Sequence, residues 1–239
     1  MTGRKSFQFL LLRHGESIWN HQNRFTGWAD IPLTENGKMQ AAKVGEILAA
    51  NKIKPFSIFA SDLQRSIDTS EIIKKKLNTE FETHCSWRLN EKSYGDCEGV
   101  CRDDLVKHMS KDYVSELRRS YFMLPPKLEN EMKYDFVDYQ IKTSKHYFKH
   151  NLQNGETKEM VLHRFLPYWY EAIIPKIKNH ACPLIVTHKH TARVLIKYLT
   201  HMPLHEFDNL DFPNSQIYHI KLNSEFFVEN KDTDISILE

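Results

Sequence analysis

The chain has 239 residues, of which 41% are hydrophobic and 27% are charged, and its formal net charge is +2. This length and composition predict a folded globular protein and exclude a disordered, collagen-like or disulfide-stapled small chain. The near-neutral charge excludes a general attraction to nucleic acid or to anionic membranes, so any preference for anions must be local.

The first predicted element is a strand. Residues Phe7 to Leu12 form a dense apolar run without helical period, as in a strand buried on both faces of a parallel sheet. The run is too short for a signal-peptide core or a membrane span. The four cysteines lack the spacing of disulfide frameworks and of zinc sites. These features favour a cytoplasmic protein with reduced thiols.

A helical pattern begins at Thr34, which suits the N-cap position, and completes a βα unit. A second strand is predicted from Phe56 to Ala60, followed by a turn and cap at Ser61-Asp62. The apolar face of the next helix runs from Leu63 to Leu77. This places Arg65 in the first turn of that helix.

The second half of the chain repeats the alternation. An amphipathic stripe from Leu162 to Ile177 precedes a strand at Pro183 to Thr187 and a helix from about Thr191 to Leu199, with His188 just past the strand. Alternating strands and helices predict an α/β fold, with a mostly parallel central sheet covered by helices on both faces. Ligands bind at the carboxyl edge of such a sheet.

We expect one domain over residues 1–239. The charged stretch at about 102–150 contains helical pieces and a Pro125-Pro126 break, which predicts a helical insertion over the active-site edge. Residues at about 224–239 form a short acidic tail.

The sharpest local signal is Arg13-His14-Gly15-Glu16-Ser17, with Trp19-Asn20 close behind, at the end of the first strand. This segment resembles the phosphoglycerate mutase family, within the histidine phosphatase superfamily. Its residue types suit phosphoryl transfer, which depends on positioning and on cations around the phosphate. A neutral imidazole is a good nucleophile toward phosphorus, and Arg13 supplies a planar cation beside it.

The resemblance implies a catalytic role for each of five residues. His14 would carry the phosphoryl group, Arg13 and Arg65 would bind the phosphate, Glu91 would act as acid and base, and His188 would be the second active-site histidine. Glu91 lies in Leu-Asn-Glu-Lys-Ser-Tyr-Gly, which is similar to the mutase-type segment at this position. The resemblance runs from about Phe7 to Leu222.

Further segments resemble the mutase branch in particular. The loop Arg24-Phe25-Thr26-Gly27-Trp28 is similar to a loop that holds the substrate carboxylate, and Arg118-Arg119 to a pair that clamps the far anion. The residues assigned to substrate binding are Asn20, Thr26, Gly27, Tyr94, Arg102, Arg118, Arg119 and Lys189. The implied activity is interconversion of 3-phosphoglycerate and 2-phosphoglycerate, primed by 2,3-bisphosphoglycerate and without a metal.

The chain departs from the family pattern at several places. Lys189 follows His188 where the family usually has glycine, so it is either strained by a positive φ or adds a cation for phosphate. The segments Tyr134 to Val137 and Phe212 to Ser215 also differ, and the acidic tail Glu229 to Glu239 stands where mutases commonly have a longer basic one. A site that this tail closes less completely would admit water to the phosphohistidine and add phosphatase activity.

Two other functions remain open: a phosphatase of the same superfamily for small phosphomonoesters, and a catalytically weak phosphoester-binding paralogue. Metal binding by His188 and His190 is disfavoured, because no Cys or carboxylate spacing accompanies them. The basic run Lys74 to Lys76 suits a solvated helix end. We therefore expect phosphoglycerates as partners, neither nucleic acid nor membrane, and leave a homodimer open.

Overall fold

The computed structural model describes residues 7–80, 82–128, 154–179 and 181–239. The segment Tyr134 to Val137 and the rest of the insertion beyond residue 128 lie outside the described residues. A six-stranded sheet has the order β3-β2-β4-β1-β5-β6. Its strands are β1 (Phe7–Arg13), β2 (Ser57–Ala60), β3 (Glu82–Cys85), β4 (Leu184–Thr187), β5 (Ile217–Leu222) and β6 (Ile235–Leu238).

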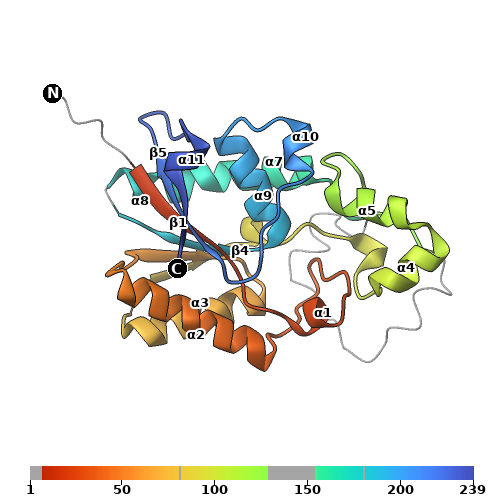
Figure 1. The fold of residues 1–239 in the computed structure, drawn as a ribbon, viewed down its shortest axis with the longest axis horizontal. Helices are drawn as coiled ribbons and strands as arrows, with labels where there is room; N and C mark the ends of the chain where they lie inside the picture. Colours follow the sequence, from red (N-terminus) through yellow and green to blue (C-terminus); the bar gives the residue numbers. More distant parts are fainter. Residues whose placement is uncertain (1–6, 81, 129–153, 180) are drawn as a thin grey trace.

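The sheet is mostly parallel, as the alternation of elements predicts. Strands β3, β2, β4 and β1 run parallel, while β5 pairs antiparallel with β1 and β6 pairs antiparallel with β5. Helices cover both faces (Figure 1). They are α1 (Ile18–His21), α2 (Glu35–Ala50), α3 (Gln64–Leu77), α4 (Arg102–His108), α5 (Lys111–Arg119), α7 (Lys158–Tyr168), α8 (Ile174–Lys178), α9 (Lys189–Leu199), α10 (Leu204–Phe207) and α11 (Lys231–Asp234).

Strand β1 is buried on both faces, which explains its continuous apolar run. Leu10 and Leu12 pack with residues of α2 and α3 on one side of the sheet. Phe9 and Leu11 pack with residues of α7 and α9 on the other. Because successive side chains of a strand point to opposite faces, an apolar hexamer serves two cores at once. The two cores fix β1 in the sheet, and with it the residues that follow.

Side-chain caps begin five of the ten α-helices in the described residues. The Thr34 side chain accepts a hydrogen bond from the Gly37 amide and caps α2, as predicted. The predicted cap at Ser61-Asp62 is wrong, because the N-cap position of α3 is Leu63, which has no side-chain cap. Instead Asp30 Oδ1, from a distant loop, accepts the Gln64 amide at 2.7 Å. A carboxylate brought by the tertiary fold therefore replaces a local cap.

The stripe from Leu162 to Ile177 forms one helical run made of α7, a π-helical turn at Trp169–Ile173, and α8. Pro175 lacks the amide hydrogen that would bond the carbonyl four residues earlier, which is a common cause of such an irregular turn. Helix α9 begins at Lys189, two residues before the predicted start, so His188 occupies its N-cap position.

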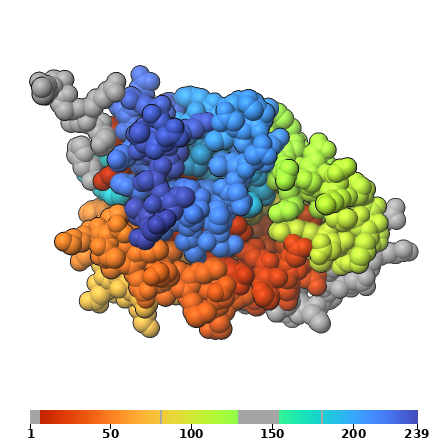
Figure 2. Space-filling view, in the orientation of Figure 1, coloured from red at the N-terminus to blue at the C-terminus, as the bar shows by residue number. Residues whose placement is uncertain are grey.

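The described part of the insertion, residues 102–128, stands at the end of the molecule where the strands have their carboxyl ends. Helices α4 and α5 share an apolar cluster with Phe25 and Tyr94 of the neighbouring loops. In the space-filling view, the insertion (green) borders the red segment near the N-terminus and the lighter blue segment around residue 200 (Figure 2). The insertion is thereby held against the loops that carry the candidate site.

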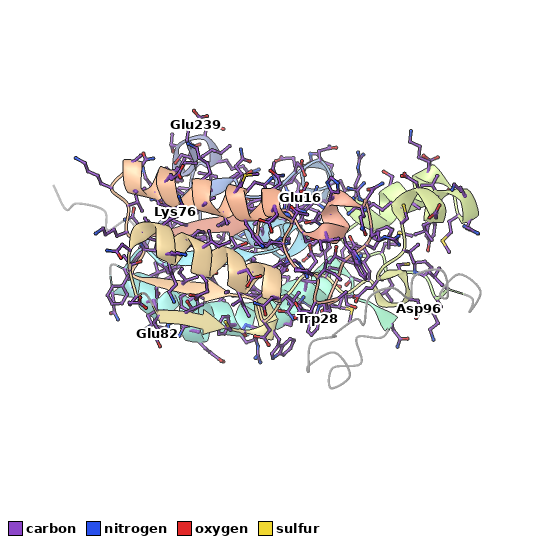
Figure 3. The ribbon with its side chains drawn as sticks, turned by 90° about the horizontal axis from the view of Figure 1, so that it is seen from below. Glu16, Trp28, Lys76, Glu82, Asp96 and Glu239 are labelled. Carbon is purple, nitrogen blue, oxygen red and sulfur yellow. The ribbon has the colours of Figure 1, made fainter. Side chains whose placement is uncertain are left out.

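The C-terminal residues form an element that the sequence pattern did not predict. Strand β6 pairs with β5 in the register Ile217 to Leu238 and Ile220 to Ile235, at the edge of the sheet. In Figure 3, Glu239 lies in the half of the molecule that contains Glu82, away from Asp96. None of the helices in the described ranges has the length and apolar character needed to cross a bilayer.

Candidate active site

A cavity of about 370 Å³ lies at the carboxyl ends of the parallel strands, between the loops after β1 and β2 and the insertion. It brings together every residue that the sequence analysis proposed for the site, with the exception of His188, whose ring lies 4.8 Å from that of His14. These lining residues are Arg13, His14, Asn20, Thr26, Gly27, Arg65, Glu91, Tyr94, Arg102, Arg118, Arg119 and Lys189.

His14 is held in one orientation at the end of β1. Its Nδ1 lies 2.6 Å from the Gly15 carbonyl oxygen, and Arg65 Nε donates to Nε2 at 3.3 Å. Since a carbonyl only accepts, the ring hydrogen belongs on Nδ1 and the lone pair on Nε2. Burial, with the charges of Arg65 and Arg13, lowers the pKa of His14 well below its ordinary value of 6.5. The site therefore contains a neutral imidazole with its lone pair on Nε2, the nitrogen to which Arg65 donates.

Two guanidinium groups flank this imidazole. Arg65 is buried in the first turn of α3 and donates to the carbonyl oxygens of Ala29 at 2.8 Å and Gly27 at 2.7 Å. Arg13 Nη1 donates to the Phe212 carbonyl oxygen at 3.0 Å. Burial lowers the pKa of each arginine to about 10, so both remain cations at neutral pH. They supply fixed positive charge where a phosphate would meet His14.

His188 is fully buried at the N-cap position of α9, and its Nε2 lies 2.7 Å from Ser61 Oγ. Ser61 Oγ accepts the Leu63 amide, and when it gives its own hydrogen to His188 Nε2, that ring nitrogen is the acceptor. The ring hydrogen of His188 then lies on Nδ1, which is buried without a partner among the described residues. Burial, together with Arg65 and His14, lowers the pKa of His188 well below 6.5. A neutral donor is thus available to a phosphoryl oxygen.

The Glu91 carboxylate is oriented by backbone donors. Glu91 is 9% exposed, and its Oε1 accepts the amides of Lys92 at 2.8 Å and His190 at 3.1 Å. The second of these amides belongs to the first turn of α9, where helix amides favour negative charge. Trp28 Nε1 donates to the Glu91 carbonyl oxygen at 2.6 Å and fixes the backbone below it.

The loop Thr26-Gly27 has a conformation that requires glycine. Gly27 has φ +53°, and a Cβ at this position would lie 2.1 Å from Oε1 of Glu98. Glu98 accepts the amides of Trp28 at 3.1 Å and Tyr94 at 3.0 Å, and burial raises its pKa to about 7. The Thr26 hydroxyl is buried without a partner among the described residues, so it can bind a ligand.

The far side of the cavity carries further cations. Arg118 and Arg119 occupy the last two positions of α5, and Arg102 begins α4. Arg102 Nη1 is held by Asn23 Oδ1 at 3.0 Å, while its Nε is buried without a partner in the described part of the chain. The cavity therefore has two cationic ends, one around His14 and one on the insertion.

Lys189 has an ordinary helical conformation as the first residue of α9, and it is absent from the residues with positive φ. The strain alternative is therefore wrong. Its ammonium forms an ion pair with Asp211, which also lines the cavity. The replacement of glycine by lysine thus adds a cation to the cavity wall together with an acidic partner.

Sequence reasoning missed several residues that build the site. Ser61 orients His188, Asp211 pairs with Lys189, and Asn214 Nδ2 donates to the His14 carbonyl oxygen at 2.7 Å. His190, considered only as a metal ligand, lies with its Nε2 2.7 Å from the Tyr94 hydroxyl. No local pattern could reveal these pairs, since each joins distant segments. In the described ranges no three His, Cys, Asp or Glu residues are grouped as metal ligands.

Comparison with known proteins agrees with this geometry. The family model of the histidine phosphatase superfamily (branch 1) matches residues 9–138 and 127–231. A 2,3-bisphosphoglycerate-dependent phosphoglycerate mutase of Buchnera aphidicola subsp. Cinara cedri is 38% identical over 208 residues, covering 87% of this chain and 90% of that protein. Another, from Buchnera aphidicola subsp. Schizaphis graminum, is 32% identical and covers 93% of this chain and 96% of that protein.

Solved structures share the fold at lower identity. A protein named mycobacterial hydrolase 1 is similar with a TM-score of 0.73 and 19% identity, covering 98% of this chain and 97% of that chain. A mycobacterial glucosyl-3-phosphoglycerate phosphatase, in complex with VO3, is similar with a TM-score of 0.70 and 22% identity, covering 90% and 92%.

Proposed function

Since the chain belongs to the phosphoglycerate mutase family of the histidine phosphatase superfamily, we propose that it interconverts 3-phosphoglycerate and 2-phosphoglycerate through a phosphorylated His14. The observation that carries this proposal is one cavity with two cationic ends, one containing the His14 nucleophile and the other Arg118 and Arg119. A phosphoglycerate has a phosphate for the first end and a carboxylate for the second.

The phosphate end supplies the chemistry. Nε2 of His14 forms a bond to phosphorus while the bond from phosphorus to the substrate oxygen breaks. Arg13 and Arg65 neutralise the charge that spreads over the phosphoryl oxygens, and His188 Nδ1 donates a hydrogen bond to one of them. Because these groups are already fixed by protein contacts, they need little rearrangement during the transfer.

Glu91 moves the proton. As the ester oxygen leaves, Glu91 gives it a proton, and in the reverse direction it takes the proton of the hydroxyl group that attacks phosphorus. The two backbone amides that bind Glu91 Oε1 keep the carboxyl group at the edge of the cavity. Proton transfer and phosphoryl transfer thus use two side chains, Glu91 and His14, that line the same cavity.

The second end of the cavity supports a mutase rather than a general phosphomonoesterase. Arg102, Arg118 and Arg119 add cations to a wall remote from the nucleophile, where a simple alkyl phosphate would leave them unused. Arginine binds carboxylates through a planar fork, which selects for an acidic substrate.

The residues also fit 2,3-bisphosphoglycerate as the primer. Unpartnered buried polar atoms lie near both ends of the cavity, at Arg13 Nε, Thr26 Oγ1 and Arg102 Nε among the described residues. When bound, this compound supplies the phosphoryl group that charges His14. Arg13 and Arg65 would hold that group, and Arg118 and Arg119 the rest of the anion. No metal has a role in this proposal, since arginines fill the role of the cation.

The test is an enolase-coupled assay with 3-phosphoglycerate, with and without catalytic 2,3-bisphosphoglycerate, on the wild type and His14→Ala. We expect turnover that requires the primer and vanishes in the variant. Acid-labile phosphoprotein should form in the wild type alone. Persistent labelling of His14→Ala would contradict the role of His14. Absence of turnover in a correctly folded wild type would favour a phosphatase or a phosphoester-binding protein.

A phosphatase activity is the second candidate, favoured by the course of the C-terminal residues. Residues 224–239 include the edge strand β6, and none of them lines the cavity, so they do not shield it from water. Water that reaches phosphorylated His14 would release inorganic phosphate. Phosphate release from 2,3-bisphosphoglycerate, measured beside mutase turnover, tests this candidate; release that is negligible against transfer would reject it.

A further inference from the structure

Three buried basic side chains converge on the carboxyl end of α5. Lys92 Nζ donates to the Leu117 carbonyl oxygen at 3.4 Å, and Arg193 Nη1 donates to that of Arg118 at 3.3 Å. Lys158 Nζ donates to the carbonyl oxygen of Ser120, the C-cap residue. The last carbonyls of a helix have no partner within the helix and carry its partial negative charge. Cations are therefore favourable donors at this place.

Burial of these basic side chains costs free energy of folding that exposure to solvent would avoid. Lys92 and Lys158 are fully buried and Arg193 is 2% exposed. Among the described residues none of the three forms an ion pair with a carboxylate. Burial lowers the pKa of Lys92 to about 8 and, with the charges of Lys92 and Arg193, that of Lys158 to about 6. Apolar residues of similar size would stabilise the fold better.

The position of α5 decides where Arg118 and Arg119 lie. The basic side chains that bind its carboxyl end come from three other segments: the loop after Glu91, helix α7 and helix α9. Two of these segments carry site residues, because Glu91 precedes Lys92 and Lys189 begins α9. The contacts therefore link the arginine end of the cavity to the end that contains the proton-transfer group.

We propose that Lys158 is a positioning residue that, with Lys92 and Arg193, holds α5 so that Arg118 and Arg119 meet the second anionic group of the substrate. The inference rests on the proposed function in taking that group to be the carboxylate of a phosphoglycerate. Lys158 is the member to test, because it does not line the cavity and, in the part of the chain that the structure describes, its Nζ donates to Ser120 at the end of α5. Lys92 adjoins Glu91, and Arg193 itself lines the cavity.

The experiment compares two ligands that differ in one group. Calorimetric binding of 3-phosphoglycerate is compared with that of glycerol 3-phosphate, which has the same phosphate but a hydroxymethyl group in place of the carboxylate. Binding is measured without primer, so the result does not depend on turnover. Because charge-assisted hydrogen bonds contribute about 1.5–3 kcal/mol, the wild type should prefer 3-phosphoglycerate by about tenfold or more.

In Lys158→Met this preference should fall by about fivefold or more, since about 1 kcal/mol is lost when the arginines move. Affinity for glycerol 3-phosphate should stay within about twofold, because His14, Arg13 and Arg65 keep their contacts. Lys158→Arg should restore the preference, as it retains an N–H donor for the Ser120 carbonyl oxygen. Lys176→Met is the matched control. In the wild type Lys176 pairs with Glu82 on β3, so this variant should bind both ligands like the wild type.

A folded Lys158→Met that keeps the full preference for 3-phosphoglycerate would overturn the inference. An equal loss of affinity for 3-phosphoglycerate and glycerol 3-phosphate would also overturn it. If Lys158→Met does not fold, Lys158→Gln takes its place with the same expectation, because its shorter uncharged side chain falls short of Ser120. A wild type that binds both ligands equally would overturn the inference and the assignment of Arg118 and Arg119. Labelling of His14 would still report separately on the proposed chemistry.

Discussion

Lys189, the first residue of α9, forms an ion pair with Asp211 in the wall of the cavity that contains His14. Asp211 Oδ1 also accepts the Phe212 amide at 2.9 Å, and the Phe212 carbonyl oxygen accepts Arg13 Nη1 at 3.0 Å. The lysine is thereby connected to the phosphate end through one short segment. Its hydrogen bond is the main reason that the pKa of Asp211 is lowered.

Lys189→Met should lower kcat/KM by about fivefold to tenfold, because an unpaired Asp211 carboxylate then repels the anionic substrate. Asp211→Asn should change kcat/KM in the opposite direction or leave it unchanged, since Lys189 becomes free to bind phosphate. Both side chains are partly exposed, so stability should change by no more than about 1 kcal/mol. Steady-state kinetics of the two variants decides; losses of equal size in both would contradict this account.

His14 and His188 should remain neutral well below pH 6.5. Burial and the charge of Arg65 lower the pKa of both rings, so neither gains a proton as the pH falls from 8 to 6. Nitrogen NMR of histidine-labelled protein should show neutral rings at pH 6, with the hydrogen of His14 on Nδ1. His21, whose side chain is 73% exposed, provides a comparison within the same sample. A midpoint near 6.5 for His14 would contradict the prediction.

Ser61→Ala should slow the chemical step. The variant removes the partner of His188 Nε2, so the ring can adopt the other tautomer or turn away from the phosphoryl group. A lost hydrogen bond of this kind is worth about 1–3 kcal/mol, which predicts a fall in kcat of about tenfold to a hundredfold with little change in KM. Ser86→Ala, at the start of a short helical turn, is the control. An unchanged kcat would show that Ser61 does not orient His188.

Stability should depend on pH through Lys158. Its pKa in the folded protein is about 6, below the ordinary value of 10.5, so between these values the unfolded chain binds a proton that the folded chain does not. The free energy of unfolding should therefore rise with pH from about 6 to about 10, with a contribution of up to about 1.4 kcal/mol per pH unit. Lys158→Met should lose this contribution and be more stable than the wild type at pH 7. Urea unfolding at pH 6 to 9 measures the free energy of unfolding of both proteins. If the two free energies change in parallel with pH, the expectation is contradicted.

The elements that were predicted correctly are those that neighbouring residues in the sequence indicate. The run Phe7 to Leu12 and the cap at Thr34 indicate β1 and α2, because burial on both faces and capping each leave a trace in neighbouring residues. The predicted cap at Ser61-Asp62 is wrong, because the Gln64 amide at the start of α3 donates its hydrogen bond to Asp30, which comes from another loop. Strand β6 has the apolar sequence Ile-Ser-Ile-Leu, but it is only four residues long, lies at the sheet edge with none of them fully buried, and follows a run of acidic residues.

The apolar pattern of the chain indicates which residues follow the carboxyl ends of the strands, and the resemblance of their motifs indicates a phosphoryl-transfer site built on His14. The contacts of Ser61 with His188, of Asp211 with Lys189 and of Lys158 with the end of α5 are visible in the folded structure alone. These contacts join residues far apart in the chain, and each is chosen by geometry and burial. A single sequence records the residue types, whereas the pairing of buried polar groups arises only when the chain is packed.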